Sequence, residues 1–157
     1  MWKKFPIFLM CIAFAFFLYM QTHKLLTVYG TSMEPTLKER DVCLIDDVVT
    51  PVRGSIYVVI EPETNRWAIK RLIGLPGDTV ELVDGNTVVN GEKLELPADG
   101  TWENMKFTLG ADEYLFLGDN REDSYDGRHW DRPIYRSEIL YEAVFRIYPM
   151  SKMGSLN

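Results

Sequence analysis

The chain has 157 residues, 46% of them hydrophobic, which suits one compact domain with a substantial core and a short appendage. The formal net charge is -6 and no cluster of Lys and Arg is evident, so we expect no nucleic-acid partner. The Cys and His residues lack the spacing of zinc ligands, and the acidic stretch GDNREDSYDGRHWD lacks the spacing of an EF-hand loop. We therefore expect neither a metal nor a cofactor.

The amino-terminal segment has the pattern of a membrane anchor. MWKK precedes a run from Phe5 to His23 without Asp, Glu, Lys or Arg, and as a helix this run spans roughly 28 Å, close to the hydrocarbon thickness of a bilayer. A cleaved signal peptide is the alternative, but the end of the run offers no small-x-small cleavage site. The lysines before the run outweigh the lone Lys24 after it, which places the amino terminus in the cytoplasm. We predict a single-pass protein of the cell membrane, in contact with the lipid bilayer, with a cytoplasmic amino terminus and transmembrane signal anchor over residues 1–23 and an extracytoplasmic domain over residues 24–157.

The rest of the chain consists of short apolar runs separated by Gly, Pro and Asn, which predicts a mainly β domain of antiparallel strands. Asp84-Gly85 and Asn90-Gly91 suit the positive φ angles of tight hairpin turns, so we expect a small meander around them. Pro76-Gly77 predicts a further turn, and YRSEILYE one short helical turn. The predicted strands are Val42–Ile45, Ile56–Ile60, Arg66–Leu75, Thr79–Val83, Thr87–Val89, Lys93–Leu96, Lys106–Leu109, Tyr114–Leu117 and Ala143–Tyr148.

One predicted strand, in the stretch WAIKRLIGLPGDTVEL, carries a lysine among apolar residues. Alternation places Lys70 on one face of the strand with Ala68 and Leu72, and Arg71 on the other face. Desolvation lowers the pKa of a lysine, sometimes enough to make it a neutral base near pH 7. The alternative is a strand lysine whose amine reaches solvent.

Ser32, in YGTSMEPTL, is the candidate nucleophile. It follows the uncharged run by nine residues, which reach roughly 30 Å when fully extended, so it must lie near the membrane surface. Gly30 permits an unusual backbone conformation before it and Pro35 removes an amide donor after it, as suits a loop that presents a hydroxyl. A polar turn serine is the alternative. A nucleophilic serine needs a base, for which the chain offers Lys70 and His129, and we favour Lys70 because acidic residues adjacent to His129 in sequence rarely satisfy the geometry of a triad.

Three sequence motifs occur in the order and approximate spacing of the motifs of bacterial type I signal peptidases, the membrane-anchored Ser-Lys enzymes. These are SMEPTL with Ser32, KRLIGLPGDTV with Lys70, and GDNREDSYDGR. The chain resembles this family over nearly its whole length and is similar to its compact members. The resemblance implies a serine endopeptidase that releases secreted proteins from their signal peptides, with an antiparallel β-sheet catalytic domain of the peptidase S26 type.

Residue by residue, the resemblance makes Ser32 the nucleophile and Lys70 the general base. Ser124 matches a serine that orients the lysine amine. The amide of Ser32 matches a donor of the oxyanion hole, and some members add a hydroxyl at the position of Gly30, so backbone donors must dominate here. The supporting ion cluster implied by the resemblance consists of Asp126, Arg71 and Arg128.

The resemblance also implies preprotein substrates with small residues at the first and third positions before the cut, bound in shallow apolar pockets. Two positions depart from the family pattern: Ser55, where an aspartate is usual, and Gly127, where many members have a serine. We interpret both as structural variation that leaves room for an altered substrate preference. A specialised peptidase for pilin or conjugation proteins and a non-catalytic membrane-anchored homologue are the alternatives. The residues that match the pockets, for each of which ordinary core packing is the other interpretation, are Val28, Met33, Leu37, Ala68 and Ile69.

Overall fold

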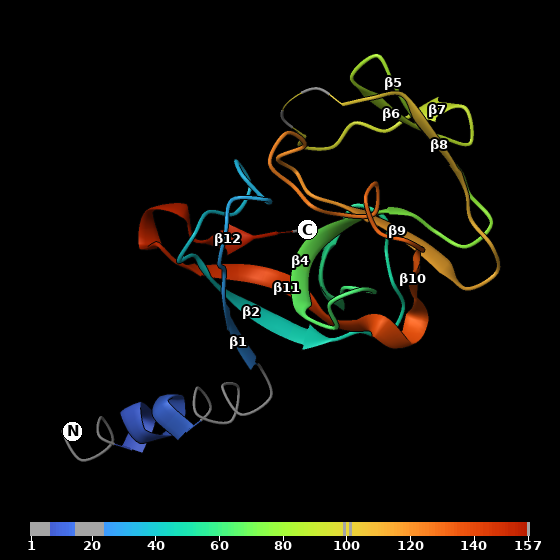
Figure 1. The fold of residues 1–157 in the computed structure, drawn as a ribbon. Helices are drawn as coiled ribbons and strands as arrows, with labels where there is room; N and C mark the ends of the chain where they lie inside the picture. The colour runs from blue at the N-terminus through green and yellow to red at the C-terminus, as the bar shows by residue number, and fades with distance from the viewer. Residues whose placement is uncertain (1–6, 15–23, 99, 101, 157) are drawn as a thin grey trace.

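The computed structural model of the chain describes residues 7–14, 24–98, 100 and 102–156. A helix covers residues 7–14 and is separate from the sheets of the folded domain (Figure 1). None of the helical segments in these ranges has the length and the apolar character needed to cross a bilayer. The other parts of the predicted anchor, residues 1–6 and 15–23, lie outside the described ranges.

A large, strongly curved sheet forms the body of the domain (Figure 1). Its strand order is β1-β2-β11-β3-β4-β9-β10, with β12 paired to β11, and every pair is antiparallel, as predicted. Because β1 ends this order, one of its edges has no strand partner among the described residues. The strands are β1 (Lys24–Thr27), β2 (Val42–Asp47), β3 (Ile56–Ile60), β4 (Trp67–Gly74), β9 (Glu113–Leu117), β10 (Ile134–Tyr135), β11 (Ile139–Tyr148) and β12 (Gly154–Ser155).

A smaller antiparallel sheet lies at one end of the large one (Figure 1), with the order β7-β6-β5-β8. Its tight turns are those that the sequence predicts. Asp84 and Gly85 have φ angles of 47° and 73°, and Asn90 and Gly91 have φ angles of 53° and 86°, in the left-handed region that two-residue hairpin loops of this kind require. The strands are β5 (Thr79–Val83), β6 (Asn86–Val89), β7 (Glu92–Lys93) and β8 (Met105–Thr108).

Three clusters of buried side chains stabilise this arrangement. The first packs β1, β2 and the segment that follows β1, and it includes Met33. The second surrounds Tyr57 and Phe116, whose rings meet edge to face with centroids 6.0 Å apart, a favourable geometry for aromatic pairs. The third joins the two sheets through residues such as Val80 of β5 and Leu115 of β9. The core therefore holds the segment after β1 and the strand β4 in fixed positions.

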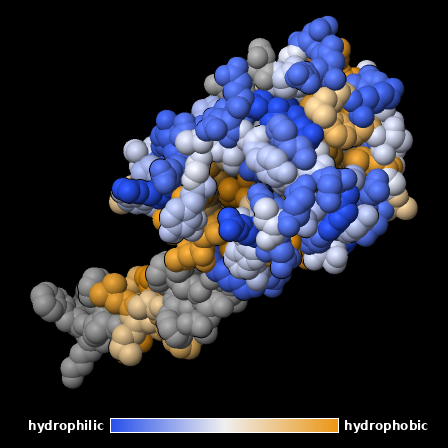
Figure 2. All heavy atoms as spheres, in the orientation of Figure 1, coloured by the Kyte–Doolittle hydropathy of each residue, from blue (hydrophilic) through white to orange (hydrophobic). Residues whose placement is uncertain are grey.

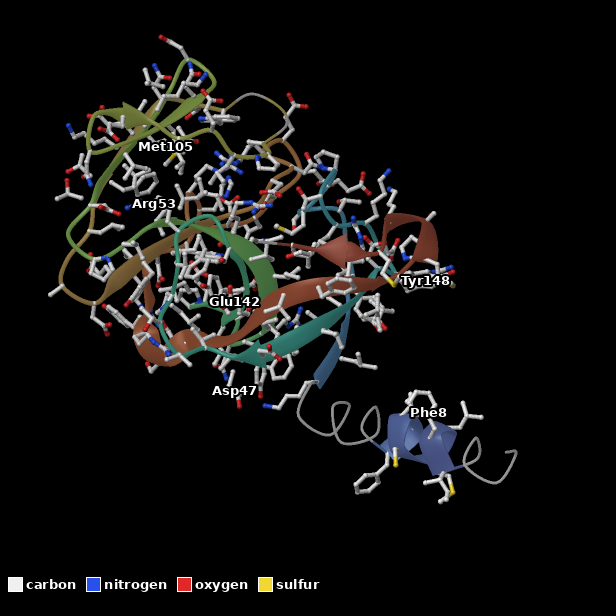
Figure 3. All side chains as sticks on the ribbon, turned by 180° about the vertical axis from the view of Figure 1, so that it is seen from behind. Phe8, Asp47, Arg53, Met105, Glu142 and Tyr148 are labelled. Atoms are coloured by element: carbon white, nitrogen blue, oxygen red, sulfur yellow. The ribbon has the colours of Figure 1, made fainter. Side chains whose placement is uncertain are left out.

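Polar contacts also join the two sheets. Arg53 lies between them (Figure 3), where its Nη1 donates to the carbonyl of Ile73 at 2.7 Å and forms an ion pair of 2.8 Å with Asp78. Asp78 also accepts from the amide of Leu75 at 2.6 Å and from Nδ2 of Asn90 at 2.7 Å. Burial alone would raise the pKa of Asp78, but these partners lower it below its ordinary value. The contacts of Asp78 thus hold the turn that follows β4 against the small sheet.

The observed strands differ from the predicted ones in three respects. β11 begins four residues earlier than predicted, and the predicted strand Lys93–Leu96 is wrong, because only Glu92–Lys93 pairs with β6 before the chain turns away. β1, β10 and β12 have no counterpart in the prediction, since two to four residues are too few to show alternation. The predicted helical turn is present as a 3-10 helix, Arg136–Glu138.

Candidate active site

Ser32 lies in the segment between β1 and β2, on a backbone that hydrogen bonds hold in place. The amide of Val28, just after β1, donates to the carbonyl of Asp41 at 2.8 Å. The carbonyl of Ser32 itself accepts from the amide of Asn120 at 3.0 Å, which ties it to the segment after β9. Gly30 has a φ of +83°, a conformation that glycine adopts without steric cost. The backbone around the hydroxyl is therefore defined from both sides.

The structure brings Ser32 and Lys70 into direct contact. The Nζ atom of Lys70 donates to Oγ of Ser32 at 2.7 Å, across 38 positions of the sequence. Lys70 is only 5% exposed, and this burial lowers the pKa of its amine, partly opposed by the carboxylates of Asp126 and Glu61. When the amine is neutral the hydroxyl donates to it instead, which is the arrangement that general-base activation of a serine requires.

Gly118, directly after β9, lies between the Ser32 backbone and the side chain of Ser124. A methyl group on Gly118 would lie 2.5 Å from the carbonyl oxygen of Ser32 and 2.2 Å from Oγ of Ser124, so only glycine fits here. The Ser124 hydroxyl is buried and close enough to Asp126 to help lower the pKa of that carboxyl, but it makes no hydrogen bond of good geometry to any described residue. Its predicted contact with the amine of Lys70 is not formed in this structure, and its orienting role stays a prediction.

Two buried ion pairs lie next to this site. Arg128 contacts both carboxylate oxygens of Asp126, at 2.8 and 3.0 Å. Burial alone would raise the pKa of Asp126, but the hydrogen bond from Arg128 keeps it below its ordinary value. Arg71 instead contacts both oxygens of Asp119, at 2.8 and 2.6 Å. The single cluster implied by the resemblance is therefore two separate pairs, because alternation along β4 directs Arg71 away from the face of Lys70.

A groove of about 300 Å³ runs beside Ser32 and Lys70. One wall comes from β1 and the residues after it, and the other from the first half of β4. Residues Trp67–Lys70 pair with β3 on one side, but β4 pairs with β9 only from Arg71 onward, so no described strand pairs with the other edge of Trp67–Lys70. An extended peptide adds readily to such an unpaired edge.

The predicted pocket residues divide between this groove and the core. Val28, Ala68 and Ile69 line the groove. Met33 and Leu37 are not among the residues that line it, and their side chains pack in the first core cluster, which agrees with the core-packing interpretation. Val28 belongs to the same cluster and also lines the groove.

Most of the chain matches one protein family. The profile described as signal peptidase, peptidase S26, matches residues 1–148. The chain belongs to this family of serine peptidases. It is 37% identical over 142 residues to a signal peptidase I of Leptolyngbya laminosa, which covers 80% of this chain and 68% of that protein. It is 31% identical over 145 residues to a signal peptidase I of Bacillus licheniformis, with 80% and 77% covered.

Another relative and a solved structure agree with this assignment. A probable signal peptidase I-2 of Synechocystis is 38% identical over 141 residues, covering 81% of this chain and 64% of that protein, so the chain spans slightly less than two thirds of its length. The crystal structure of a signal peptidase I from Enterococcus faecalis matches with a TM-score of 0.52 and 26% identity, covering 59% of this chain and 95% of that one.

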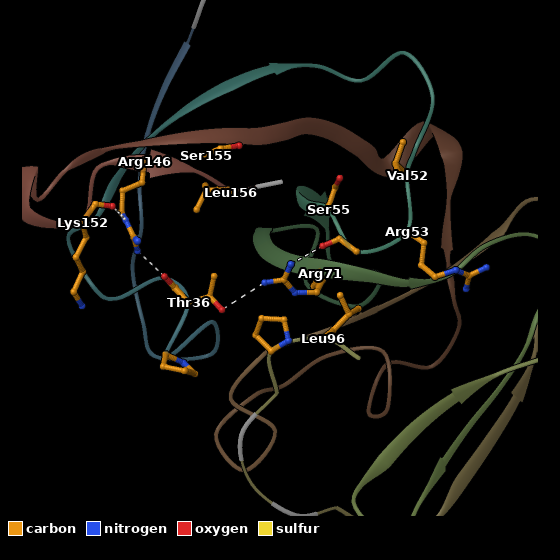
Figure 4. Close-up of a pocket in the computed structure, with 13 residues that line it drawn as sticks. Thr36, Val52, Arg53, Ser55, Arg71, Leu96, Arg146, Lys152, Ser155 and Leu156 are labelled. Atoms are coloured by element: carbon orange, nitrogen blue, oxygen red, sulfur yellow. Dashed lines mark hydrogen bonds between the residues drawn. The ribbon is translucent and has the colours of Figure 1, made fainter. Parts of the chain in front are cut away.

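A second cavity, of about 740 Å³, is lined by Arg71 (Figure 4), which alternation along β4 places on the face opposite Lys70. Arg146 donates to the carbonyl of Thr36 at 2.6 Å, and Arg71 lies 3.5 Å from the hydroxyl of the same residue. Both arginines already have an aspartate partner, so we interpret this cavity as support for the segment that carries Ser32. Ser55, where signal peptidases usually have an aspartate, lines this cavity and not the groove.

The departure at Gly127 has a steric reason. The amide of Gly127 donates to the carbonyl of Phe116 at 2.9 Å. A methyl group at this position would lie 2.7 Å from that carbonyl oxygen and 2.7 Å from Cδ1 of Leu115. The serine of many family members therefore does not fit here without a shift of β9, which supports the interpretation as structural variation.

His129 lies in a surface loop, which agrees with the choice of Lys70 over His129 as the base. Its side chain is 46% exposed, its Nδ1 accepts from the amide of Asp126 at 3.4 Å, and its ring stacks on Tyr125 with centroids 5.4 Å apart. No hydrogen bond joins it to Ser32 in the described part of the chain. Within the same ranges, no group of three or more His, Cys, Asp or Glu residues could hold a metal ion.

Sequence reasoning missed four residues of the site. Gly118, Asp119 and Asn120 open the third motif, GDNREDS, so the motif itself was the signal that could have identified them. Glu61, which lines the groove, follows β3 in the turn EPETNR and has no such signal. Its position depends on the pairing of β3 with β4, which alternation alone does not specify.

Proposed function

We propose that the chain is a membrane-bound serine endopeptidase that cleaves amino-terminal signal peptides from secreted preproteins through Ser32 and Lys70. The observation that carries this proposal is the distance of 2.7 Å between Lys70 Nζ and Ser32 Oγ, with the amine buried and its pKa lowered. Burying an amine is costly. A non-catalytic homologue has no evident use for this costly contact, so the observation favours an active enzyme.

The reaction follows from these groups. The neutral amine of Lys70 accepts the hydroxyl proton as Oγ of Ser32 attacks the scissile carbonyl carbon. The amide of Ser32, which donates to no described residue, is available to stabilise the oxyanion. The protonated amine then gives its proton to the leaving nitrogen, and an acyl-enzyme remains. In the second half of the reaction Lys70 accepts a proton from a water molecule as the water oxygen attacks the ester carbonyl, and it returns this proton to Oγ of Ser32 as the acyl group leaves.

The groove suits an extended substrate. We infer that the signal peptide adds along the unpaired edge of Trp67–Lys70, where backbone hydrogen bonds give affinity without sequence preference. Val28, Ala68 and Ile69 then form shallow apolar pockets beside the reactive pair. Shallow pockets of this kind accept small side chains, which agrees with substrates that have small residues at the first and third positions before the cut.

We further propose that residues 1–23 anchor the chain in the cell membrane with the amino terminus in the cytoplasm, and that residues 24–157 act on the extracytoplasmic side. Apolar surface gathers where the folded body meets its amino-terminal end (Figure 2). Among the residues of β1, the segment after it and the start of β4, Leu25, Tyr29 and Trp67 are exposed by more than half. Large exposed apolar side chains of this kind mark sites of contact with lipid or protein.

The test is cleavage of a preprotein by the detergent-solubilised full chain. A preprotein with an A-x-A site should be cut directly after that site, and Ser32→Ala should abolish the cut. A pilin or conjugation precursor serves as the comparison substrate. Cleavage of that precursor alone would favour the specialised peptidase, and no cleavage of either substrate by the folded chain would contradict the proposal.

A further inference from the structure

Glu61 gives the groove a charge at the end away from Ser32. Apart from Lys70, it is the one charged residue among the described residues that line this groove. It directly follows β3, and its amide donates to the carbonyl of Arg66 at 2.8 Å, next to the paired residues Ile60 and Trp67. Its carboxylate therefore lies at the entrance to the edge where a substrate strand would add.

The carboxylate of Glu61 is free to meet a substrate cation. One oxygen accepts from the hydroxyl of Thr64 at 2.6 Å, and no Lys, Arg or His in the described ranges forms an ion pair with it. Its field reaches the reactive end of the groove, where it opposes the effect of burial on the pKa of Lys70. A negative charge that acts over this distance also acts on a peptide lying between the two residues.

Strand geometry fixes which substrate residue meets this charge. Glu61 lies beside Arg66, four positions before Lys70 along β4. Extended chains advance about 3.3 Å per residue, so a substrate strand that runs along β4 covers this distance in roughly four residues. In the proposed function the pockets at Val28, Ala68 and Ile69 hold residues before the cut, so that side of the substrate lies along this wall.

We propose that Glu61 selects substrates with a basic side chain, Lys or Arg, at the fourth or fifth position before the cleaved bond. This inference rests on the proposed function, since it assumes cleavage by Ser32 and an extended peptide in the groove. Glu61 is partly exposed, and ion pairs at such positions contribute up to about 1 kcal/mol. We therefore expect a preference of about threefold to fivefold in kcat/KM, which decreases with added salt because screening weakens a partly exposed pair.

The experiment compares peptides that share one A-x-A cleavage site and differ at one position. Lys is placed in turn at each of the second to sixth positions before the cut, with Gln at the same position as the neutral reference. The full chain in detergent micelles is assayed with each pair, together with Glu61→Gln, Glu61→Lys and the control Glu63→Gln. Glu63 lies in the same turn and carries the same charge, but it does not line the groove, and its Oε1 accepts from the amide of Asp131.

The ratio of the two rates is the readout, so general changes in activity or folding cancel. We expect a Lys-over-Gln ratio of about threefold to fivefold at the fourth or fifth position, a ratio near one in Glu61→Gln, and the full ratio in Glu63→Gln. Glu61→Lys should reverse the preference, so that the Gln peptide is cut faster than the Lys peptide at the same position. A ratio near one at every position in the parent chain, or a preference that survives Glu61→Gln, overturns the inference while cleavage itself is intact. Absence of cleavage of all peptides contradicts the proposed function instead.

Discussion

The burial of the Lys70 amine lowers its pKa, and its contact with the Ser32 hydroxyl determines which proton it can accept. Four charged groups act on Lys70 besides burial: Asp126, Glu61 and Asp119 raise the pKa of the amine, and Arg128 lowers it. Burial has the largest effect, so the pKa lies below its ordinary value of 10.5. The amine thus loses its proton at a lower pH than a surface lysine, and the contact with Ser32 gives that neutral amine a proton to accept.

Removing either member of this pair should abolish cleavage. We expect Ser32→Ala and Lys70→Ala each to reduce kcat by several orders of magnitude, and the double variant to be hardly slower than either single one, because residues that act as a unit are not additive. Single-turnover assays with an A-x-A peptide measure this. His129→Ala should keep most of the activity, since its ring contacts Tyr125 and not Ser32. Substantial cleavage by Lys70→Ala would mean that another base operates.

The pH dependence of activity and the pH dependence of stability should both reflect the protonation of the Lys70 amine. Activity should rise with pH through the lowered pKa, since only the neutral amine is a base. Between that pKa and 10.5 the unfolded chain binds more protons than the folded one, so the contribution of Lys70 to stability increases with pH across this window. Lys70→Met should therefore be more stable than the parent chain below the lowered pKa, with the difference shrinking towards 10.5.

Thermal unfolding of both proteins from about pH 6 to about pH 10 tests this difference. An amine-selective reagent provides an independent measurement, since only the neutral amine reacts. A pKa near 10 for Lys70 in the folded chain, or a constant difference in stability between the two proteins, would rule out the role of a neutral base.

At the scale of elements, the segment after β9 is held against the nucleophile loop without space between them. We expect Gly118→Ala to cost about 1 to 3 kcal/mol of stability, as overpacking does, because the carbonyl of Ser32 is backbone and cannot rotate away from the methyl group. Its kcat should fall at least about tenfold, since displacement of Ser32 by a fraction of an ångström disturbs the reactive geometry.

Gly154→Ala in β12 is the matched control for this substitution. A methyl group at Gly154 meets no atom within 4 Å, so neither denaturant unfolding nor peptide cleavage should change. Equal effects of the two substitutions, or full activity of Gly118→Ala, would show that the close approach at Gly118 does not matter for catalysis.

Sequence reasoning was most successful where a local rule applies. The turns at Asp84-Gly85 and Asn90-Gly91 depend on two residues each, and the strand around Lys70 is a run of eight residues that ends before the predicted turn at Pro76-Gly77. The contact between Lys70 and Ser32 was expected from the order of motifs, since 38 positions separate the two residues and no local rule joins them.

The failures have a common physical cause. β1 was missed because it exists through pairing with β2 and not through its own sequence pattern. Arg71 was grouped with Asp126 because the motifs specify which residues occur and not which of them pair, although alternation already placed Arg71 on the face opposite Lys70. Met33 and Leu37 were assigned to pockets, but the segment between β1 and β2 packs both side chains into the first core cluster. Each error concerns tertiary contacts of a correctly identified residue type.

At the scale of the whole molecule, the chemistry and the anchor should be separable. A chain without residues 1–23 should still cleave a short peptide at a rate similar to that of the full chain, because Ser32, Lys70 and their contacts all lie beyond that segment. It should be more soluble but keep a preference for detergent, since Tyr29 and Trp67 remain 76% and 60% exposed. Peptide assays with and without detergent measure both properties. A folded truncated chain without activity in detergent would show that the anchor takes part in the reaction.

β4 pairs with β9 only from Arg71 onward, so the two halves of β4 should differ in their rates of amide hydrogen exchange. In Trp67–Lys70, backbone amides that point away from β3 have no strand partner in the described part of the chain, so we expect them to exchange with solvent. From Arg71 onward β4 pairs with β9, and the amide of Leu72 donates to the carbonyl of Ser55 on the other side, so these amides should stay protected. An uncleaved peptide bound to Ser32→Ala should slow exchange only at the outward amides of the first half of β4. Exchange in the first half of β4 would then report whether a peptide occupies the groove, and exchange in the second half would serve as the reference within the same strand.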